Sequence, residues 1–225
     1  MKVAVVHGQV HKRNTYRLTH MLLEKLNCES SDITEFTVND IGHCVGCYNC
    51  IMKDEKLCPH RMAVEPIIEA LEAADVIVLD SPNYVMGMSG QLKTFCDHMA
   101  YRWMSHRPHA SMQHKIGVAI STTAGAGAKK VTKDICNQFT WWSVGKSYQI
   151  PFALSATTWD EVKPKRRIKI DRKLNQIAKA INKKQGIGKS SLKTRFLFFI
   201  MKQMQKSMSY NPVDQEYWKS QGWIR

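Results

Sequence analysis

Four cysteines lie within fifteen residues of one another and form the most reactive group in this 225-residue sequence. They are Cys44, Cys47, Cys50 and Cys58. Four thiolates at this spacing can hold an iron–sulfur cluster, because such clusters take cysteine ligands that often come from close Cys-x2-Cys runs. Zinc also accepts four cysteines, or three with a histidine such as His43 or His60. Free or disulfide-switching thiols are the third interpretation, so the spacing predicts metal or redox chemistry and leaves its kind open.

A polar loop from Gly8 to Thr15 is a candidate phosphate-binding site. It follows a short apolar run and leads into a helix, whose free backbone N–H groups and dipole favour an anion. Asn14 or Thr15 can add a side-chain donor. Positive charge is available from His11, Lys12 and Arg13. The same pattern is typical of an ordinary helix N-cap, so the loop by itself supports both interpretations.

Two further loops of small and polar residues follow other apolar runs. In the first, a rigid Ser81-Pro82 turn, the aromatic Tyr84 and a flexible Gly87 would suit the rim of a flat ring. The alternative is an ordinary strand-to-helix turn with a packing tyrosine. The second loop, Ser121–Gly127, consists of small residues and is supported mainly by its position after a strand.

Alternating strands and helices must position these loops. Apolar runs predict strands over Val3–His7, Ile33–Val38, Asp75–Asp80, Lys115–Ile120 and Lys146–Ile150. Helical spacing predicts helices over Thr15–Leu26, Val64–Ala74, Ser89–Trp103 and Ala128–Trp142. This alternation predicts an α/β fold with a doubly wound parallel sheet of five strands, covered by helices on both faces. Ligands bind beyond the carboxyl ends of the strands in such sheets, which is where the three loops begin.

The four clustered cysteines lie in a long connection, from about Asn39 to Arg61, after the second strand. Structureless connections of that length are uncommon in compact domains and are usually functional. Outside it, Cys28, Cys96 and Cys136 are interpreted as small core residues. A group of histidines is interpreted as scattered over the surface, because Pro108 breaks its helical register and no carboxylate accompanies it. These are His98, His106, His109 and His114.

Positive charge is concentrated in the last third of the chain. Residues 1–160 contain 16 basic and 15 acidic residues, whereas residues 161–225 contain 17 and 4. We therefore predict an electrically balanced domain over residues 1–160 and a basic helical C-terminal extension over residues 161–225. Within the extension, helices are expected over about Lys165–Lys183 and Ser190–Met208.

The second of these helices carries an apolar stripe at four-residue steps. Its members are Leu192, Phe196, Ile200, Met204 and Met208, with Phe199 and Met201 beside them. The stripe favours docking onto the body of the protein or onto a partner subunit. Contact with an anionic membrane surface through this basic helix is less favoured, and so is nucleic-acid binding.

The cellular compartment is predicted from three observations. The total of seven cysteines is odd and contains a tight cluster, which suits a reducing cytosol. No apolar run approaches the length that crosses a bilayer. The N-terminus lacks the pattern of a signal peptide. Together these observations predict a cytoplasmic protein.

A family resemblance enters at residues Ser81–Asp97, which resemble the SPxYxxxxSGxLKxFxD stretch of NADPH-dependent FMN reductases and iron–sulfur flavoproteins. The Gly8–Thr15 loop resembles the phosphate loop of that family, and Thr122–Gly127 resembles its glycine-rich flavin loop. The resemblance covers about residues 1–155. It implies a flavodoxin-like fold with strand order 2-1-3-4-5 and FMN as the cofactor.

Carried over by position, the resemblance implies which residues contact FMN. The phosphate loop begins at Gly8, and its implied contacts are Gln9, His11, Arg13, Asn14 and Thr15. The implied ring contacts are Pro82, Asn83, Tyr84, Val85, Met86 and Gly87 from the second loop, and Thr122, Thr123, Ala124 and Gly125 from the third. Gln9 replaces the usual serine of the family, and His11 replaces an arginine. The cysteine spacing matches the compact motif of iron–sulfur flavoproteins, which implies a 4Fe–4S cluster as one candidate for that loop.

Three functions follow as hypotheses. The first is an FMN-dependent oxidoreductase of the NAD(P)H-dependent flavin or quinone reductase type. The second is an iron–sulfur flavoprotein that carries FMN and a 4Fe–4S cluster and exchanges electrons with a ferredoxin-like partner. The third is a basic binding protein on a degenerate flavodoxin scaffold. The expected partners are a small-molecule electron acceptor or a redox protein and further copies of the chain, as a dimer or tetramer. No catalytic acid or base is named, because hydride transfer to a flavin ring needs none.

Overall fold

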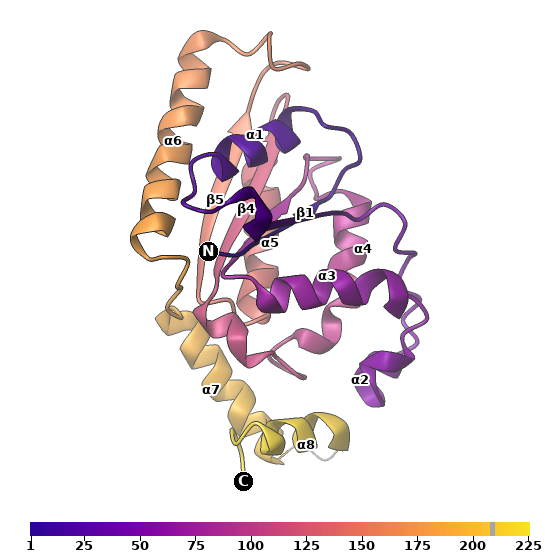
Figure 1. Cartoon of the computed structure of the whole chain (residues 1–225). Coiled ribbons are helices and arrows are strands. Elements are labelled where there is room, and N and C mark those ends of the chain that lie inside the picture. Colours follow the sequence, from indigo (N-terminus) through magenta and orange to yellow (C-terminus); the bar gives the residue numbers. More distant parts are fainter. Residues whose placement is uncertain (208–209) are drawn as a thin grey trace.

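The computed structural model describes residues 1–207 and 210–225, and its centre is a parallel sheet of five strands (Figure 1). The strands are β1 (Val3–His7), β2 (Ile33–Thr37), β3 (Val76–Asp80), β4 (Ile116–Thr123) and β5 (Lys146–Ala153). Their order in the sheet is β2-β1-β3-β4-β5. The predicted doubly wound, flavodoxin-like fold is therefore confirmed.

The register of the strands brings the ends of β1 and β3 to one level. His7, the last residue of β1, lies opposite Asp80, the last residue of β3. Asp80 in turn pairs with Ile120 of β4. The loops that begin at Gly8 and Ser81 therefore start side by side. β4 continues three residues past its predicted end, because β5 pairs with it as far as Thr123.

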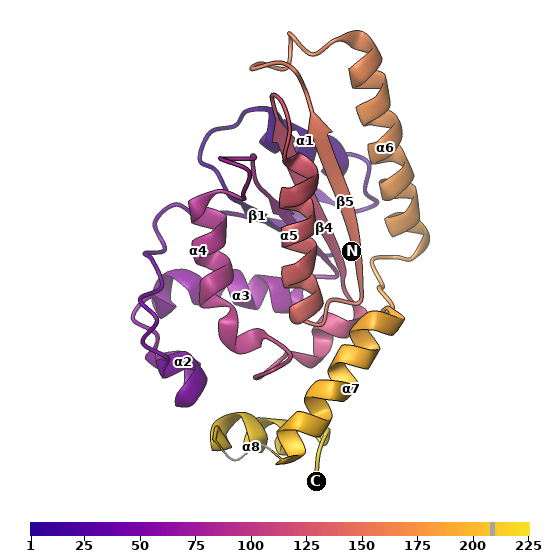
Figure 2. The same ribbon diagram turned by 180° about the vertical axis from the view of Figure 1, so that it is seen from behind.

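Helices cover both faces of the sheet (Figure 2). On one face, α1 (Asn14–Leu23) and α6 (Pro164–Lys183) bury Leu18, Leu22, Ile170 and Leu174 against the strands. On the other face lie α3 (Arg61–Ala73), α4 (Gly90–His98) and α5 (Ala128–Trp141). The first helix after residue 160 thus packs into one of the main cores, although it belongs to the predicted extension.

The predicted helix over Ser89–Trp103 is shorter in the structure. It ends at His98, and a 3-10 turn follows over Ala100–Arg102. The chain turns there because Arg102 donates to Glu72 of α3 at 2.7 Å and the Met104 N–H donates to the Trp141 carbonyl at 2.7 Å. Contacts between distant segments therefore end a helix that local spacing would continue.

The cysteine connection is not structureless. It contains the short helix α2 (Asn49–Met52) and a 3-10 turn over Glu55–Leu57. Gly42 has a φ of +64°, and a Cβ there would lie 2.5 Å from the His60 ring. Only glycine therefore fits the start of this connection without a shift.

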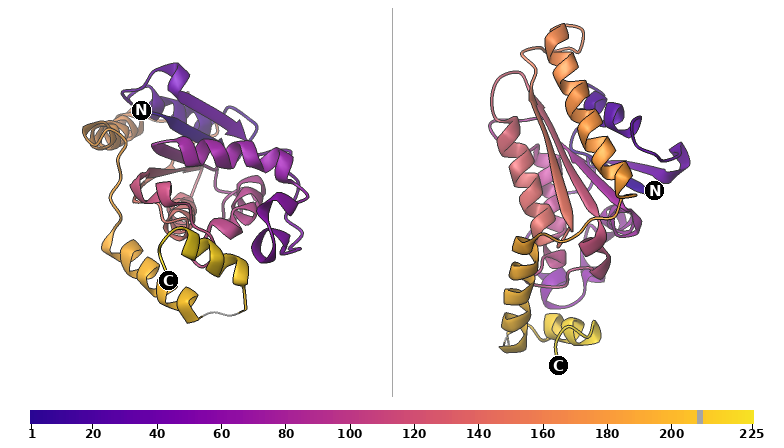
Figure 3. Two further views of the ribbon diagram at one scale, coloured as in Figure 1. Left: turned by 60° about the horizontal axis from the view of Figure 1, so that its bottom comes forward. Right: turned by 90° about the vertical axis from the view of Figure 1, so that its left-hand side faces the viewer.

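Two further helices end the chain, α7 (Leu192–Ser207) and α8 (Pro212–Ser220), and Figure 3 shows them at one end of the molecule. The expected helix Ser190–Met208 matches α7, and its last residue, Met208, lies outside the described residues. The sequence pattern did not predict α8. A third apolar cluster joins this end to the body through Met104, Met201, Trp218 and Ile224.

The apolar stripe predicted on α7 is mostly exposed. Leu192 is 82% exposed, Phe196 63% and Phe199 57%. The helix docks through Phe198, whose ring centroid lies 5.0 Å from that of Trp218, and through Met201 and Ile200, which the sequence analysis placed beside and in the stripe. The four-residue pattern did not include Phe198, because its core contacts come from α8, which the pattern did not predict. Among the described residues, none of the helices has both the length and the apolar composition needed to cross a membrane.

Candidate functional site

The three predicted ligand loops meet at the carboxyl edge of the sheet. Thr15 of the first loop and Thr122 of the third share a buried hydrogen bond of 2.6 Å between their hydroxyls. His11 and Tyr84 join the first loop to the second, with 3.0 Å between Nε2 and the phenol oxygen. The Asn83 N–H donates to the Thr122 carbonyl at 2.9 Å. Each loop therefore contacts both of the others, as the sequence predicted from strand order.

Gly8 brings the backbone of the first loop against the second. Its N–H donates to the Asp80 carbonyl at 2.9 Å. A Cβ at this position would lie 2.8 Å from that carbonyl oxygen and 2.7 Å from the Ser89 hydroxyl. Only glycine permits so close an approach, which leaves the following backbone N–H groups at the sheet edge.

Each of the three loops holds one buried polar atom that has no hydrogen-bond partner in the described structure. These atoms are Gln9 Oε1, Asn83 Oδ1 and Ser121 Oγ. The amide groups are oriented by their other ends, since Gln9 Nε2 donates to Asp80 at 2.9 Å and Asn83 Nδ2 to the Ala126 carbonyl at 2.9 Å. An unsatisfied buried acceptor costs about 1–3 kcal/mol, so such atoms indicate a ligand that carries donors. FMN carries ring N–H and ribityl O–H donors, and the three loops fit it in this respect.

The charged residues of the first loop are exposed, whereas Asn14 is already bonded. His11, Lys12 and Arg13 have exposed side chains. The Asn14 amide donates to the Thr157 carbonyl at 3.0 Å, which ties α1 to the segment before α6. Backbone groups and the exposed cations, rather than the Asn14 side chain, are therefore available for a phosphate.

The tip of the second loop is a strained two-residue turn. Tyr84 and Gly87 exchange backbone hydrogen bonds of 2.9 Å in both directions. Between them, Val85 has a φ of +48° and Met86 a φ of +63°. The sequence suggested that Gly87 supplies flexibility, but the unusual conformations fall on these two residues. Left-handed φ at a β-branched residue is strained, and such strain is concentrated at ligand sites. Val85 is also fully exposed at the rim of the site.

Among the remaining implied contacts, Pro82 and Thr122 are buried. Thr123 accepts from Asn83 Nδ2 at 3.5 Å and donates to the Ala126 carbonyl at 3.1 Å. Ala124 and Gly125 are exposed at the tip of the third loop. The structure thus brings Gly8 and the fifteen implied contacts to one edge of the sheet.

The four cysteines of the connection lie near one another. Cys44 and Cys47 are exposed, and Cys50 and Cys58 are half-buried. The pKa of Cys50 is raised to about 11, first by burial and then by the charges of Cys58, Cys44 and Cys47. Tetrahedral zinc would hold sulfurs roughly 3.8 Å apart. In residues 1–207 and 210–225, no three of these thiols lie within 4.8 Å of one another, a spacing looser than zinc requires.

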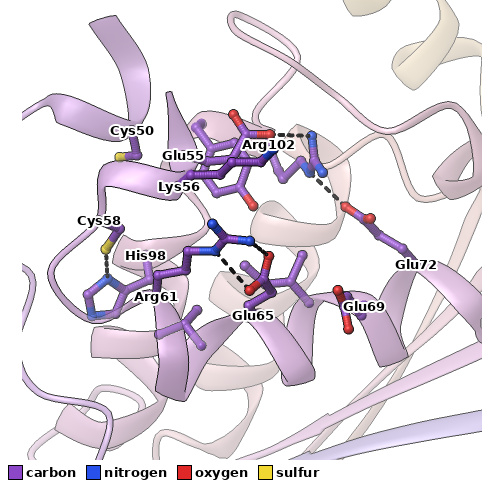
Figure 4. A pocket seen from close by; sticks show the side chains of 13 residues that line it. Cys50, Glu55, Lys56, Cys58, Arg61, Glu65, Glu69, Glu72, His98 and Arg102 are labelled. Carbon is purple, nitrogen blue, oxygen red and sulfur yellow. Dashed lines mark hydrogen bonds and ion pairs between the residues drawn. The ribbon is translucent and has the colours of Figure 1, made fainter. Parts of the chain in front are cut away.

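His98 faces the cysteine connection, and its interpretation as a surface histidine is wrong. It is buried, and its Nε2–H donates to the Gly42 carbonyl at 3.0 Å. Because that ring nitrogen carries the proton, Nδ1 is the acceptor that lies 3.8 Å from Cys58 Sγ (Figure 4). The last turn of α4, which begins at the second flavin loop, therefore also contacts the cysteines.

A buried ion pair fixes the backbone of α2 to the end of the chain. Arg107 Nη1 donates to Asp214 Oδ1 at 2.6 Å and to the Ile51 carbonyl at 3.0 Å. Its Nη2 donates to the Cys50 carbonyl. Asn211 donates to the same Ile51 carbonyl at 3.1 Å. Arg107 and Asp214 are buried, so α8 holds the backbone that carries Cys50.

Sequence reasoning missed Arg107 and Asp214. The sequence gives only a weak indication of Asp214. It is one of four acidic residues after residue 160, and it lies in the first turn of the helix that begins at Pro212. His106, interpreted as a surface histidine, also contacts this carboxylate, with 2.6 Å between Nδ1 and Asp214 Oδ2.

A cavity of about 160 Å³ lies between the cysteine connection and α3 (Figure 4). Cys50 and Cys58 line one side of it. On the other side, Arg61 is paired with Glu65 of the next turn, and Arg102 with Glu72. The cavity gives a polar approach to two of the four sulfurs, away from the three flavin loops.

Known proteins that resemble this chain in sequence or structure agree with this fold. The family model for NADPH-dependent FMN reductase matches residues 1–155. An iron–sulfur flavoprotein of Archaeoglobus fulgidus is 24% identical over 229 residues and covers 100% of both chains. An iron–sulfur flavoprotein of Methanocaldococcus jannaschii is 32% identical over 146 residues, 62% of this chain and 72% of its own. The solved FMN-dependent NADH-azoreductase of Bacillus anthracis, in complex with FMN, is 10% identical, with a TM-score of 0.57 over 81% of this chain and 100% of its own.

Proposed function

The chain belongs to the NADPH-dependent FMN reductase family, and we propose that it transfers electrons from NAD(P)H through FMN to a small acceptor such as a flavin or quinone. Each flavin loop supplies one buried acceptor atom without a partner, and this observation carries the proposal. A ligand shared by the three loops would give each of these atoms a partner.

Bound FMN supplies the oxidation–reduction chemistry, so the residues of this chain have to bind and orient it. The backbone after Gly8 and the exposed Arg13 would hold its phosphate. Asn83 and Ser121 offer acceptors toward the ring and its side chain. The turn at Val85 and Met86 is exposed, so a nicotinamide or an acceptor could reach the flavin beside it.

Two measurements test this function. The purified chain is expected to bind one equivalent of FMN. Quenching of flavin fluorescence measures this binding. With FMN it is expected to oxidise NAD(P)H when a quinone is present. Protein that is colourless and takes up no added FMN would contradict the proposal and favour the basic binding protein on a degenerate flavodoxin scaffold.

A second candidate is an iron–sulfur flavoprotein with a 4Fe–4S cluster on Cys44, Cys47, Cys50 and Cys58. One observation favours it: Arg107 and Asp214 fix the backbone of Cys50, which belongs to the compact group of four cysteines. The similar iron–sulfur flavoproteins of Archaeoglobus fulgidus and Methanocaldococcus jannaschii support the same chemistry.

Iron and sulfide analysis of anaerobically purified protein separates the two candidates. The cluster predicts four iron atoms per chain and slow NAD(P)H oxidation, with rapid electron exchange with a ferredoxin-like protein. Flavin absorption without iron would contradict the cluster and leave the plain reductase.

Location and assembly complete the proposal. Seven cysteines without a disulfide framework support a cytoplasmic protein. The exposed apolar side chains of α7 support a dimer or tetramer of the chain.

A further inference from the structure

Two histidines and a glutamate converge behind the first flavin loop, where no flavin contact is proposed. His7 ends β1, His20 lies in the last turn of α1, and Glu35 lies on β2. His7 Nε2 is 2.8 Å from Glu35 Oε2, and His20 Nε2 is 3.0 Å from the same oxygen. These three are the only trio of histidine, cysteine or acidic ligand atoms within 4.8 Å of one another in the described part of the chain.

His20 Nε2 lies within ion-pair distance of Glu35 Oε2 but does not have the geometry of a hydrogen bond to it. Nε2 is buried and has no hydrogen-bond partner among the described residues, although it lies 3.0 Å from Glu35. The Glu35 oxygen is already hydrogen-bonded to His7, so His20 Nε2 is the atom of the trio without a hydrogen bond. A cation would satisfy both nitrogens and the oxygen together.

A second layer of polar groups orients His7. Its Nδ1 lies 2.7 Å from Asp80 Oδ2, and Asp80 is fully buried. Thr19 donates to the same oxygen at 2.6 Å, and Gln9 donates to the other at 2.9 Å. In the ion-free chain His7 donates from both nitrogens, Nδ1–H to Asp80 at 2.7 Å and Nε2–H to Glu35 Oε2 at 2.8 Å, so a bound cation would replace the Nε2 proton. This carboxylate–histidine arrangement is the usual support of metal-binding histidines.

We propose that His7, His20 and Glu35 form a site for a divalent transition-metal ion, with Zn²⁺ as the preferred ion. Two imidazole nitrogens and one carboxylate oxygen are a common zinc ligand set that leaves the fourth position to water. Ligands of tetrahedral zinc stand roughly 3.3 Å apart, so the three atoms need to separate by about half an ångström. Glu35 and His20 are each about one-third exposed, which permits this movement and the entry of the ion.

The ion would tie together β1, β2 and α1 at the edge strand of the sheet. His7 directly precedes Gly8, so the site anchors the start of the first flavin loop from behind. The Tyr16 ring packs against both histidines, with centroid distances of 4.9 Å to His7 and 4.1 Å to His20, and forms one wall. This role does not depend on FMN or on the cysteines.

The test must separate this site from the four thiols, which also bind zinc and cobalt. Co²⁺ is therefore titrated into the full-length chain, because thiolate ligation gives intense charge-transfer absorption that imidazole and carboxylate ligands lack. Total bound metal is measured by equilibrium dialysis in the same samples. The variants are Glu35→Gln, which keeps the shape of the side chain, and His20→Ala. His114→Ala, at an exposed histidine, is the matched control.

We expect wild type and His114→Ala to bind one equivalent of Co²⁺ more than Glu35→Gln and His20→Ala do. The thiolate absorption should be equal in all four proteins. Each ligand variant should lower the affinity for that additional metal ion by at least about tenfold. A loss of this size is already seen when only a residue that supports a metal ligand is changed. Zn²⁺ should raise the melting temperature of wild type more than that of Glu35→Gln. Equal stoichiometry and equal zinc-dependent melting in wild type and Glu35→Gln would overturn the proposal, even if His20→Ala fails to fold.

Discussion

Three buried oxygen atoms of the flavin loops can accept hydrogen bonds from a ligand. Gln9, Asn83 and Ser121 each keep one oxygen without a partner, while the other groups around them are bonded. Ser121 is fully buried at the end of β4. Removing such an atom therefore relieves an unsatisfied group in the FMN-free protein, whereas it removes a hydrogen bond from the FMN complex.

Ser121→Ala is expected to weaken FMN binding about fivefold without lowering the stability of the FMN-free chain. The loss corresponds to about 1 kcal/mol, the usual net value of one hydrogen bond. Fluorescence titration gives the dissociation constant, and urea unfolding gives the stability. Ser143→Ala is the control, since Ser143 is also buried with an unpaired hydroxyl but lies after α5 and outside the loops. Equal FMN affinity in the two variants would argue against a flavin contact at Ser121.

The cysteines divide into two classes of reactivity. Cys96 and Cys136 are buried, and burial raises their pKa to about 12 and about 11. Both thiols are therefore protonated at pH 8, and thiolate is the reactive form. Cys28, expected in the core, is half-buried at its margin.

Iodoacetamide at pH 8 is accordingly expected to modify Cys44 and Cys47 in cluster-free native protein and to leave Cys96 and Cys136 unmodified. Peptide mass spectrometry measures the extent at each site. Unfolding in guanidinium should make all seven thiols react. Fast modification of Cys96 in the native chain would show that its burial is incomplete.

At the scale of elements, α8 acts on the cysteine connection through one ion pair. Asp214 is fully buried, and Arg107 is 3% exposed. Their bond joins α8 to the segment after α4, while the remaining Arg107 donors reach the carbonyls of α2. Breaking one partner leaves an uncompensated buried charge, which is costly.

Asp214→Asn is expected to destabilise the chain by about 3–5 kcal/mol. It should also lower the iron content if the cysteines hold a cluster, because the Cys50 backbone loses its anchor. Urea unfolding and iron analysis are the measurements. Asp134→Asn removes the carboxylate of an exposed pair with Lys130 and should cost at most about 1 kcal/mol. Combining Asp214→Asn with Arg107→Met should recover part of the loss, and similar stability of Asp214→Asn and wild type would contradict the clamp.

At the scale of the whole molecule, α7 presents an exposed apolar face. Leu192, Phe196 and Phe199 are more than half exposed on one helix, and exposed apolar side chains elsewhere include Met62 and Val85. Contiguous exposed apolar surface marks a contact site. We expect a second copy of the chain to cover it.

The double variant Phe196→Glu and Phe199→Glu is expected to convert the oligomer into a monomer, because the charges would have to be buried in the contact. Light scattering after gel filtration measures the mass. Lys193→Glu, on the same helix outside this face, is the control. A wild-type monomer would contradict self-association, and binding of the chain to anionic vesicles would then identify a membrane surface instead.

The sequence by itself determined the sheet, its helices and the three loops. Apolar runs and helical spacing are local, and a parallel sheet leaves few choices for where its loops meet. Gly8, Pro82 and Thr122 could therefore be placed together from sequence. The cysteine cluster was equally visible, since its four members are close in the chain.

Only the tertiary structure decided the contacts between distant residues. His7 and Glu35 are 28 residues apart, and Arg107 and Asp214 are 107 apart, so no local pattern joins them. The same reason explains why His98 is buried and why Leu192, Phe196 and Met204 of the regular stripe on α7 are exposed. Residue spacing reports which face of an element is apolar, but the neighbouring elements decide which face is covered and which polar groups meet.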